Sequence, residues 1–206
     1  EEYANGEIVR WAWASDLIPE PCWTSAYLVD GLLIDSGSPA GLDDFRRFIE
    51  SIDPGKSIEK VVITHWHEDH SGGARYLSEE LELPVYMHEN GIEKVRNGFS
   101  YPDYRELAWG GPLEPAPKVQ LLDLDSIPTK TGKYTFDLLH MPGHSIDLVA
   151  LIEPTQEWAF LSDSIVPKYQ MIFGEKKKDL RENMEPVYDE IEQIHASLKK
   201  LQKHTS

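Results

Sequence analysis

The segment THWHEDHSGG (Thr64–Gly73) packs three histidines and an aspartate into six residues. Imidazole nitrogens and carboxylate oxygens are donors that zinc and similar divalent ions bind well in proteins. His65 and His67 are two positions apart, so on an extended or looping backbone their side chains point to the same side and can reach one ion. Asp69 and His70 follow on the next bend, where they can hold a second ion close by. This spacing predicts a metal site rather than a chance surface cluster.

The elements around this segment would place it at the end of a buried strand. The preceding run KVVITH (Lys60–His65) is apolar and β-branched, as is typical of a buried strand. From His65 onward the chain is therefore predicted to form a strand-to-helix loop, where α/β folds commonly place ligand chemistry. Gly72 and Gly73 carry no Cβ, which lets the backbone turn tightly into the next helix without a clash.

The wider sequence alternates strand and helix patterns, which predicts an α/β fold. Asp30-Gly31 lies between apolar runs, which predicts a hairpin within Thr24–Gly37. We expect one domain over residues 1–206, with an irregular insertion at about 90–117 that is rich in glycine, proline and aromatic residues. Further strands are predicted at 8–14, 60–65, 84–88, 119–122, 134–141, 147–152 and 158–161, and helices at 42–52, 73–81 and 186–202.

Composition narrows the classes of partner. The formal net charge is −16, which argues against nucleic acid as the usual partner and favours a small-molecule substrate. Cys22 is the only cysteine, so an intrachain disulfide is impossible; this fits a reducing compartment, and we expect a cytoplasmic protein. No apolar run approaches the roughly 20 residues of a membrane span, and no signal peptide is visible. The oligomeric state stays open, since the apolar stripe of the C-terminal helix could pack on another chain.

THWHEDHSGG is similar to the H-x-H-x-D-H signature of the metallo-β-lactamase superfamily. Three other segments agree with that resemblance, which extends over residues 8–165. YLVDGLLIDSG resembles the early hairpin of the family, with Asp35 near the site; MPGHS (Met141–Ser145) resembles the segment of the next ligand histidine; and FLSDSI (Phe160–Ile165) resembles the segment of the bridging aspartate. The resemblance implies a four-layer αββα sandwich with a dinuclear metal site at one edge.

Residue by residue, the resemblance implies two ions per chain. The expected metal is zinc, with iron or manganese as alternatives. Asp69 is also predicted to be catalytic, and Asp35 to accept a hydrogen bond from a ligand histidine. The implied ligands are His65, His67 and His144 for the first ion, Asp69 and His70 for the second, and Asp163 as the bridge.

The chain departs from the family pattern at two places. Ser162 stands where the family usually has glycine, which predicts a modest change in backbone or packing. In the family, a helix like IHASLKKLQK is normally followed by a short strand and a final ligand histidine. The chain stops at Ser206, and His204 lacks the Pro-Gly-His context. We therefore expect a chain truncated before the last ligand, with the second ion site incomplete or completed by a partner chain or solvent.

The predicted function is a metal-dependent hydrolase that uses a metal-bound hydroxide on a small ester, thioester or lactone. A phosphodiesterase or nuclease of the same superfamily is an alternative, which the acidic composition disfavours. A di-iron redox protein is another, but its usual variant has glutamate where this chain has His67. A non-catalytic relative is the third, and the nearly complete ligand set counts against it.

Overall fold

The computed structural model describes residues 1–17, 23–165 and 185–205. Cys22 therefore lies outside the described residues. The chain divides into two compact units. The first comprises Glu1–Asp123 and Pro128–Tyr134, and the second comprises Leu124–Ile127 and Thr135–Ser206.

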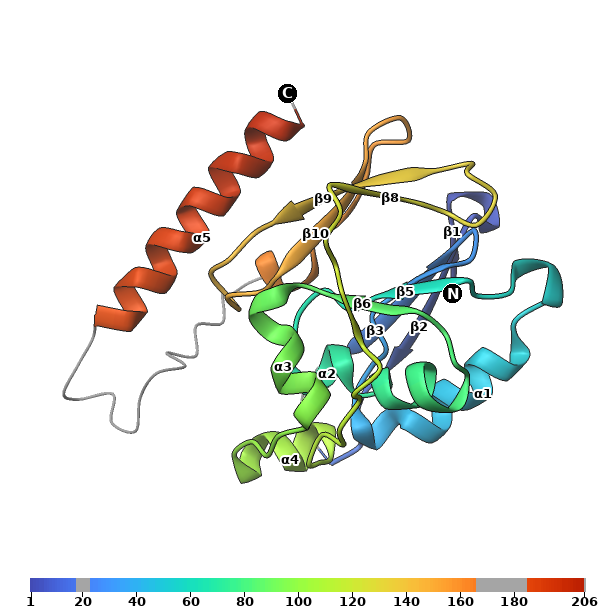
Figure 1. Ribbon diagram of the computed structural model, residues 1–206, viewed down its shortest axis with the longest axis horizontal. Coiled ribbons are helices and arrows are strands. Elements are labelled where there is room, and N and C mark those ends of the chain that lie inside the picture. The colour runs from blue at the N-terminus through green and yellow to red at the C-terminus, as the bar shows by residue number, and fades with distance from the viewer. Residues whose placement is uncertain (18–22, 166–184, 206) are drawn as a thin grey trace. The chain divides into compact units, whose positions relative to one another are not determined.

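The first unit contains a sheet whose strands follow their order in the sequence, from β1 to β7 (Figure 1). Pairing is antiparallel from β1 to β4 and parallel from β4 to β7. The parallel strands bring their carboxyl ends to one edge of the sheet, where the histidine-rich loop begins. The bounds are β1 Glu2–Tyr3, β2 Ile8–Trp13, β3 Thr24–Val29, β4 Leu32–Ile34, β5 Lys60–Val62, β6 Val85–Met87 and β7 Gln120–Leu121.

The hairpin between β3 and β4 turns at the predicted pair of residues. Asp30 and Gly31 have φ angles of 40° and 79°, so both adopt the left-handed conformation of a tight hairpin turn. A Cβ at Gly31 would lie 2.6 Å from the Cβ of Lys130, so the turn also needs glycine for space. The predicted hairpin is confirmed.

Helices of the first unit lie together on one side of this sheet (Figure 1). The core between the helices and the sheet is apolar. Phe45 of α1, Leu77 of the turn at Tyr76–Glu80 and Val95 of α3 are fully buried, as are strand residues such as Val61. Burial of each such side chain contributes about 1.5–3 kcal/mol. The helices are α1 Leu42–Ser51, α2 Glu68–Ser71, α3 Glu89–Asn97 and α4 Asp103–Trp109, with a π-helical turn at Tyr76–Glu80.

The segment predicted as an irregular insertion is more regular than expected, because it contains α3 and α4. Ile92 and Val95 bury one face of α3, and Trp109 is buried at the end of α4. Each helix ends at a glycine with positive φ, Gly98 and Gly110. The apolar face therefore determines these helices, while the glycines end them.

The second unit contains a sheet of order β11–β10–β9–β8. Pairing of β9 with β10 and of β10 with β11 is antiparallel. The bounds are β8 Ser126–Pro128, β9 Thr135–His140, β10 Val149–Glu153 and β11 Trp158–Phe160, and the unit ends with α5, Glu185–His204.

Helix α5 packs on the loop that follows β9. Ser197 donates a hydrogen bond from its hydroxyl to the carbonyl of Pro142 (2.7 Å), and a Cβ at Gly143 would lie 2.3 Å from Ile194. The predicted C-terminal amphipathic helix is found with its ends moved by two residues or fewer. Within the described residues, none of the helices is long and apolar enough to cross a lipid bilayer.

Candidate metal centre

Asp35 organises the start of the site, at the ends of two neighbouring parallel strands. Ile34 and Val62 are partners in the β4–β5 register, and the amide of Asp35 donates to the Val62 carbonyl (2.9 Å). Asp35 itself has a φ of 62° and is buried. Its Oδ1 accepts from the Thr64 amide (2.7 Å), and its Oδ2 accepts from the Thr64 hydroxyl (2.9 Å). Two strand ends are thus held together by one carboxylate.

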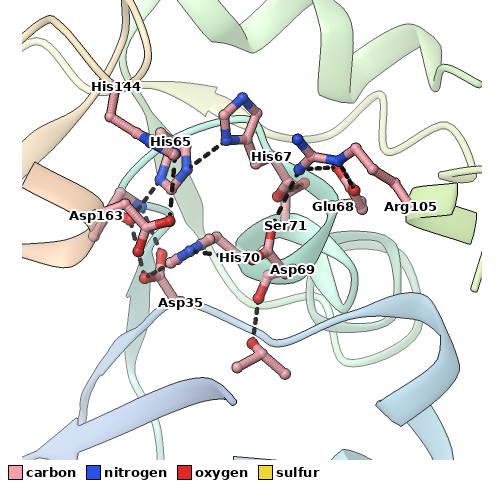
Figure 2. A network of polar contacts seen from close by, with 12 residues as sticks. Asp35, His65, His67, Glu68, Asp69, His70, Ser71, Arg105, His144 and Asp163 are labelled. Carbon is pink, nitrogen blue, oxygen red and sulfur yellow. Dashed lines mark hydrogen bonds and ion pairs between the residues drawn. The ribbon is translucent and has the colours of Figure 1, made fainter. Parts of the chain in front are cut away.

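The same carboxylate orients His70. His70 Nδ1 lies 2.8 Å from Asp35 Oδ2, so Asp35 contacts one of the predicted ligand histidines. A proton held on Nδ1 leaves Nε2 as the lone-pair donor, as is usual for a histidine that binds metal. Asp69 Oδ2 lies 3.8 Å from this Nε2 (Figure 2). Both predicted ligands of the second ion therefore face a common point.

His65 and His67 also converge. His65 Nε2 lies 3.0 Å from His67 Nδ1, and both side chains are buried (Figure 2). Two imidazole lone pairs this close need a proton or a cation between them. Zinc–nitrogen bonds of about 2.0–2.1 Å in a tetrahedral site place neighbouring donors about 3.3 Å apart. The two nitrogens therefore fit a shared ion.

The far nitrogen of His65 is also held in place. His65 Nδ1 lies 3.3 Å from the hydroxyl oxygen of Thr64, whose proton is donated to Asp35. Asp35 thus orients His70 directly and His65 through Thr64.

The glycine pair lets the loop after β4 approach the motif closely. A Cβ at Gly72 would lie 2.4 Å from the carbonyl carbon of Ser38, and a Cβ at Gly73 would lie 2.7 Å from the Ser36 oxygen. Ser36 donates its amide to the carbonyl of His70 (2.8 Å), which fixes the backbone of that residue. Residues without a Cβ are therefore needed here, but for a different reason than predicted: Gly72 has ordinary helical angles (φ −57°, ψ −32°), and the glycines make space for the neighbouring loop rather than for a tight turn.

One ion pair at this site was not predicted from the sequence. Glu68, between two predicted ligands, is almost fully buried and pairs with Arg105 of α4 through two hydrogen bonds. Burial raises the pKa of the Glu68 carboxyl, and the Arg105 guanidinium opposes this only in part. Glu68 stands within the motif and could have been singled out, whereas nothing local to Arg105 indicates a partner 37 residues away.

The second unit brings together the other two predicted ligands. His144 is buried in the loop between β9 and β10, and its Nε2 lies 3.3 Å from Asp163 Oδ2. Asp163 follows β11 in a short 3-10 helix, Ser162–Ser164. Ser162 has a φ of 49°, in the left-handed region that favours glycine, so the departure from the family pattern coincides with strained backbone.

A family model described as the metallo-beta-lactamase superfamily matches residues 20–199. The chain belongs to this superfamily. The predicted α/β fold of the metallo-β-lactamase type is confirmed. Which side chains bind metal stays a prediction.

Known relatives are distant in sequence. The thioesterase pkgB of Emericella nidulans is 26% identical over 152 residues, which are 69% of this chain and 36% of that protein. A hydroxyacylglutathione hydrolase of Bdellovibrio bacteriovorus is 24% identical over 132 residues, 64% of this chain and 42% of that protein. The match covers 43%, 36% and 54% of the length of three of the curated relatives, so the chain spans about half of such proteins.

A solved structure gives a longer match. TTHA1623, crystallised in a di-iron-bound form, is 26% identical with a TM-score of 0.62; the match covers 92% of this chain and 85% of that chain. The likeness therefore extends well beyond the histidine-rich motif.

Proposed function

We propose that the chain is a metal-dependent hydrolase with two divalent ions. In this proposal His65, His67 and His144 hold the first ion, Asp69 and His70 hold the second, and Asp163 contacts both. The observation that carries it is the approach of His65 Nε2 to His67 Nδ1 at 3.0 Å, since the separation of these two buried nitrogens fits donors that share one cation. The family match supports the reading.

Zinc is the proposed metal, and iron is the alternative. The donors are neutral imidazoles and carboxylates, which suit zinc and iron, and the set contains no thiolate. The di-iron form of TTHA1623 supports iron as a real alternative. Elemental analysis of protein produced without added metal decides between them: two zinc ions per chain support the proposal, and two iron ions favour the alternative.

The proposed substrate is a small thioester or a related ester. Two of the distant relatives carry the names thioesterase and hydroxyacylglutathione hydrolase, both of which denote thioester cleavage. The net charge of −16 supports a small molecule over nucleic acid. The single cysteine supports a reducing, cytoplasmic setting, which belongs to the same proposal.

Hydrolysis of a thioester would give Asp35 and Asp69 separate roles. Bound divalent ions lower the pKa of a coordinated water and polarise a carbonyl oxygen. Asp35 keeps the Nδ1 proton on His70, which fixes the direction of Nε2. Asp69 Oδ2 faces the same point, so we propose that it accepts a proton as water attacks the acyl carbon. The carbon–sulfur bond then breaks, and the proton that Asp69 accepted passes to the leaving thiolate, which releases a thiol and returns Asp69 to its carboxylate form.

The test is a panel of substrates offered to metal-loaded protein: a glutathione thioester, an acyl-CoA, a lactone, a β-lactam and a phosphodiester. We expect the thioesters to give the highest kcat/KM. His67→Ala should lower it by more than the roughly 10–100-fold that loss of an outer partner causes. His204→Ala, a histidine at the exposed end of α5, is the matched control and should change little.

The proposal fails if His67→Ala is as active as wild type. Exclusive turnover of the phosphodiester would replace the thioesterase assignment with the phosphodiesterase alternative.

A further inference from the structure

The motif contains a buried carboxylate that the proposed ligand set does not use. Glu68 lies between the predicted ligands His67 and Asp69, and its side chain is only 1% exposed. Removing an ionised carboxylate from water costs several kcal/mol unless a partner offsets it. The residue therefore needs a strong partner, and its place next to Asp69 makes that partner relevant to the metal site.

Arg105 is this partner, and it comes from α4 rather than from the motif. Its Nε lies 2.5 Å from Glu68 Oε1 and its Nη2 lies 2.9 Å from Glu68 Oε2. This two-pronged arrangement is the strongest geometry for an arginine–carboxylate pair, and it fixes the plane of the guanidinium. The Arg105 side chain is 12% exposed, so solvent screens the pair little.

The same guanidinium reaches the next residue. Arg105 Nη2 lies 3.7 Å from Asp69 Oδ1, while Asp69 Oδ2 lies 3.8 Å from His70 Nε2 (Figure 2). The Thr24 hydroxyl donates to the main-chain carbonyl of Asp69, which anchors the backbone. One carboxylate oxygen of Asp69 thus faces the arginine and the other faces the histidine.

We propose that Arg105 is a positioning residue for the second ion. It attracts one oxygen of Asp69 as an ion pair at 3.7 Å, longer than a hydrogen bond, so that the other oxygen faces the same point as His70 Nε2, and it balances the buried charge of Glu68. The inference rests on the proposed metal site and deepens it, because it makes the affinity for the second ion depend on Arg105, a residue of α4 outside the histidine-rich motif.

Arg105 could instead serve only to stabilise the fold. A double variant distinguishes this structural role from the proposed positioning role. Removing both charges of a buried ion pair often restores stability, since no uncompensated charge remains. A structural role predicts that Glu68→Leu combined with Arg105→Met restores both stability and metal binding. A positioning role predicts that stability recovers while Asp69 stays poorly oriented and the second ion still binds weakly.

The experiment titrates metal-free protein with Co²⁺, reading ions bound per chain and the cobalt absorption spectrum, and also measures thermal unfolding without metal. The variants are Arg105→Met, Arg105→Lys and the double variant. Arg75→Met is the matched control, because Arg75 is an exposed arginine that also contacts the segment at 90–117: it pairs with Glu114 (3.1 Å) and donates to the Pro115 carbonyl (3.1 Å).

We expect wild type to bind two Co²⁺. At a concentration that saturates wild type, Arg105→Met should retain one ion, with affinity for the second reduced about 10–100-fold. Arg105→Lys should recover part of the loss, since it keeps the charge without the planar fork. Arg75→Met should behave as wild type.

Unchanged binding of the second ion in Arg105→Met, or full recovery in the double variant, overturns the role of Arg105 and leaves the metal site standing. A wild-type protein that binds fewer than two Co²⁺ overturns the proposed function, and this inference with it.

Discussion

Single side chains next to the predicted ligands determine how those ligands are aimed. Asp35 accepts three hydrogen bonds, two from Thr64 and one from His70. Because Thr64 also contacts His65, one carboxylate restrains a predicted ligand of each ion. Such outer contacts fix the tautomer and the ring orientation of a ligand histidine, and so affect affinity without touching the metal.

Ser162, in contrast, adopts a backbone conformation that is unfavourable for a residue with a Cβ. A non-glycine residue at a φ of 49° costs on the order of 1 kcal/mol, and Ser162 directly precedes the predicted ligand Asp163. We predict that Ser162→Gly raises the free energy of unfolding by roughly 0.5–1 kcal/mol. Chemical denaturation monitored by circular dichroism measures the difference.

Ser126→Gly is the matched control, because Ser126 is an exposed residue of the strand β8. Glycine there should lower stability by roughly 0.5–1 kcal/mol, since it adds only freedom to the unfolded chain. If both variants lost stability equally, the contacts of the Ser162 side chain would outweigh the strain in its backbone.

At the scale of elements, the sequence predicts what local patterns specify. The Asp30-Gly31 pair predicts the hairpin, and the spacing of apolar residues predicts α1. The apolar run before the motif predicts β5, and therefore the place of His65 at a strand end. In each case neighbours in the chain supply the signal, so no knowledge of distant contacts is needed.

Elements that depend on distant partners are harder to predict. The short strands β1 and β8 carry little pattern of their own and exist because a neighbouring strand pairs with them. Helix α4 lies among glycines and prolines that suggest irregular structure. Since Arg105 is on α4 and Glu68 is in the motif, their ion pair could not be predicted from either local sequence.

The turn at Asp30 gives a prediction at this scale. Asp30 Oδ2 accepts from Thr129 Oγ1 (2.7 Å), Thr131 Oγ1 (2.6 Å) and the Thr131 amide (3.1 Å). Burial alone would raise the pKa of Asp30, but these hydrogen bonds outweigh it and lower the pKa below its usual value. The carboxylate form therefore stabilises the fold above the unfolded-state pKa of about 3.9, and that contribution is lost as pH falls through the folded-state value.

We accordingly predict that Asp30→Asn flattens the fall in unfolding free energy between about pH 4 and pH 2.5, and lowers stability at pH 7 by about 1–2 kcal/mol. Urea denaturation across this pH range measures both effects. Asp123→Asn, which replaces an exposed aspartate, should leave the pH dependence as in wild type. An Asp30→Asn profile parallel to that of wild type would show that the turn gains nothing from the charge.

At the scale of the whole molecule, the predicted ligands divide between the two compact units. His65, His67, Asp69 and His70 belong to the first, and the pair His144 and Asp163 belongs to the second. Motif spacing and the preceding strand predicted the grouping in the first unit, because these are local features, whereas His144 and Asp163 were predicted only from the family resemblance. The joint ligand set follows from family membership and remains part of the proposal.

If the ions bind ligands from both units as proposed, they also contribute to the stability of the whole chain. A ligand present at about 1,000 times its dissociation constant adds roughly 4 kcal/mol to the native state. For a chain of 206 residues this raises Tm by roughly 10 °C. We therefore predict that removing metal with a chelator lowers Tm by about this amount, and that differential scanning calorimetry shows a less cooperative transition than in the loaded protein.

His144→Ala separates stabilisation of the first unit alone from stabilisation that involves both units. Without His144, the first unit keeps four predicted ligands, so some metal still binds, but the second unit loses a ligand. We expect the metal-dependent rise in Tm to shrink to less than half, while the metal-free Tm changes little more than in a His204→Ala control. The same rise in His144→Ala as in wild type would mean that the first unit binds the ions alone, and the shared ligand set would have to be given up.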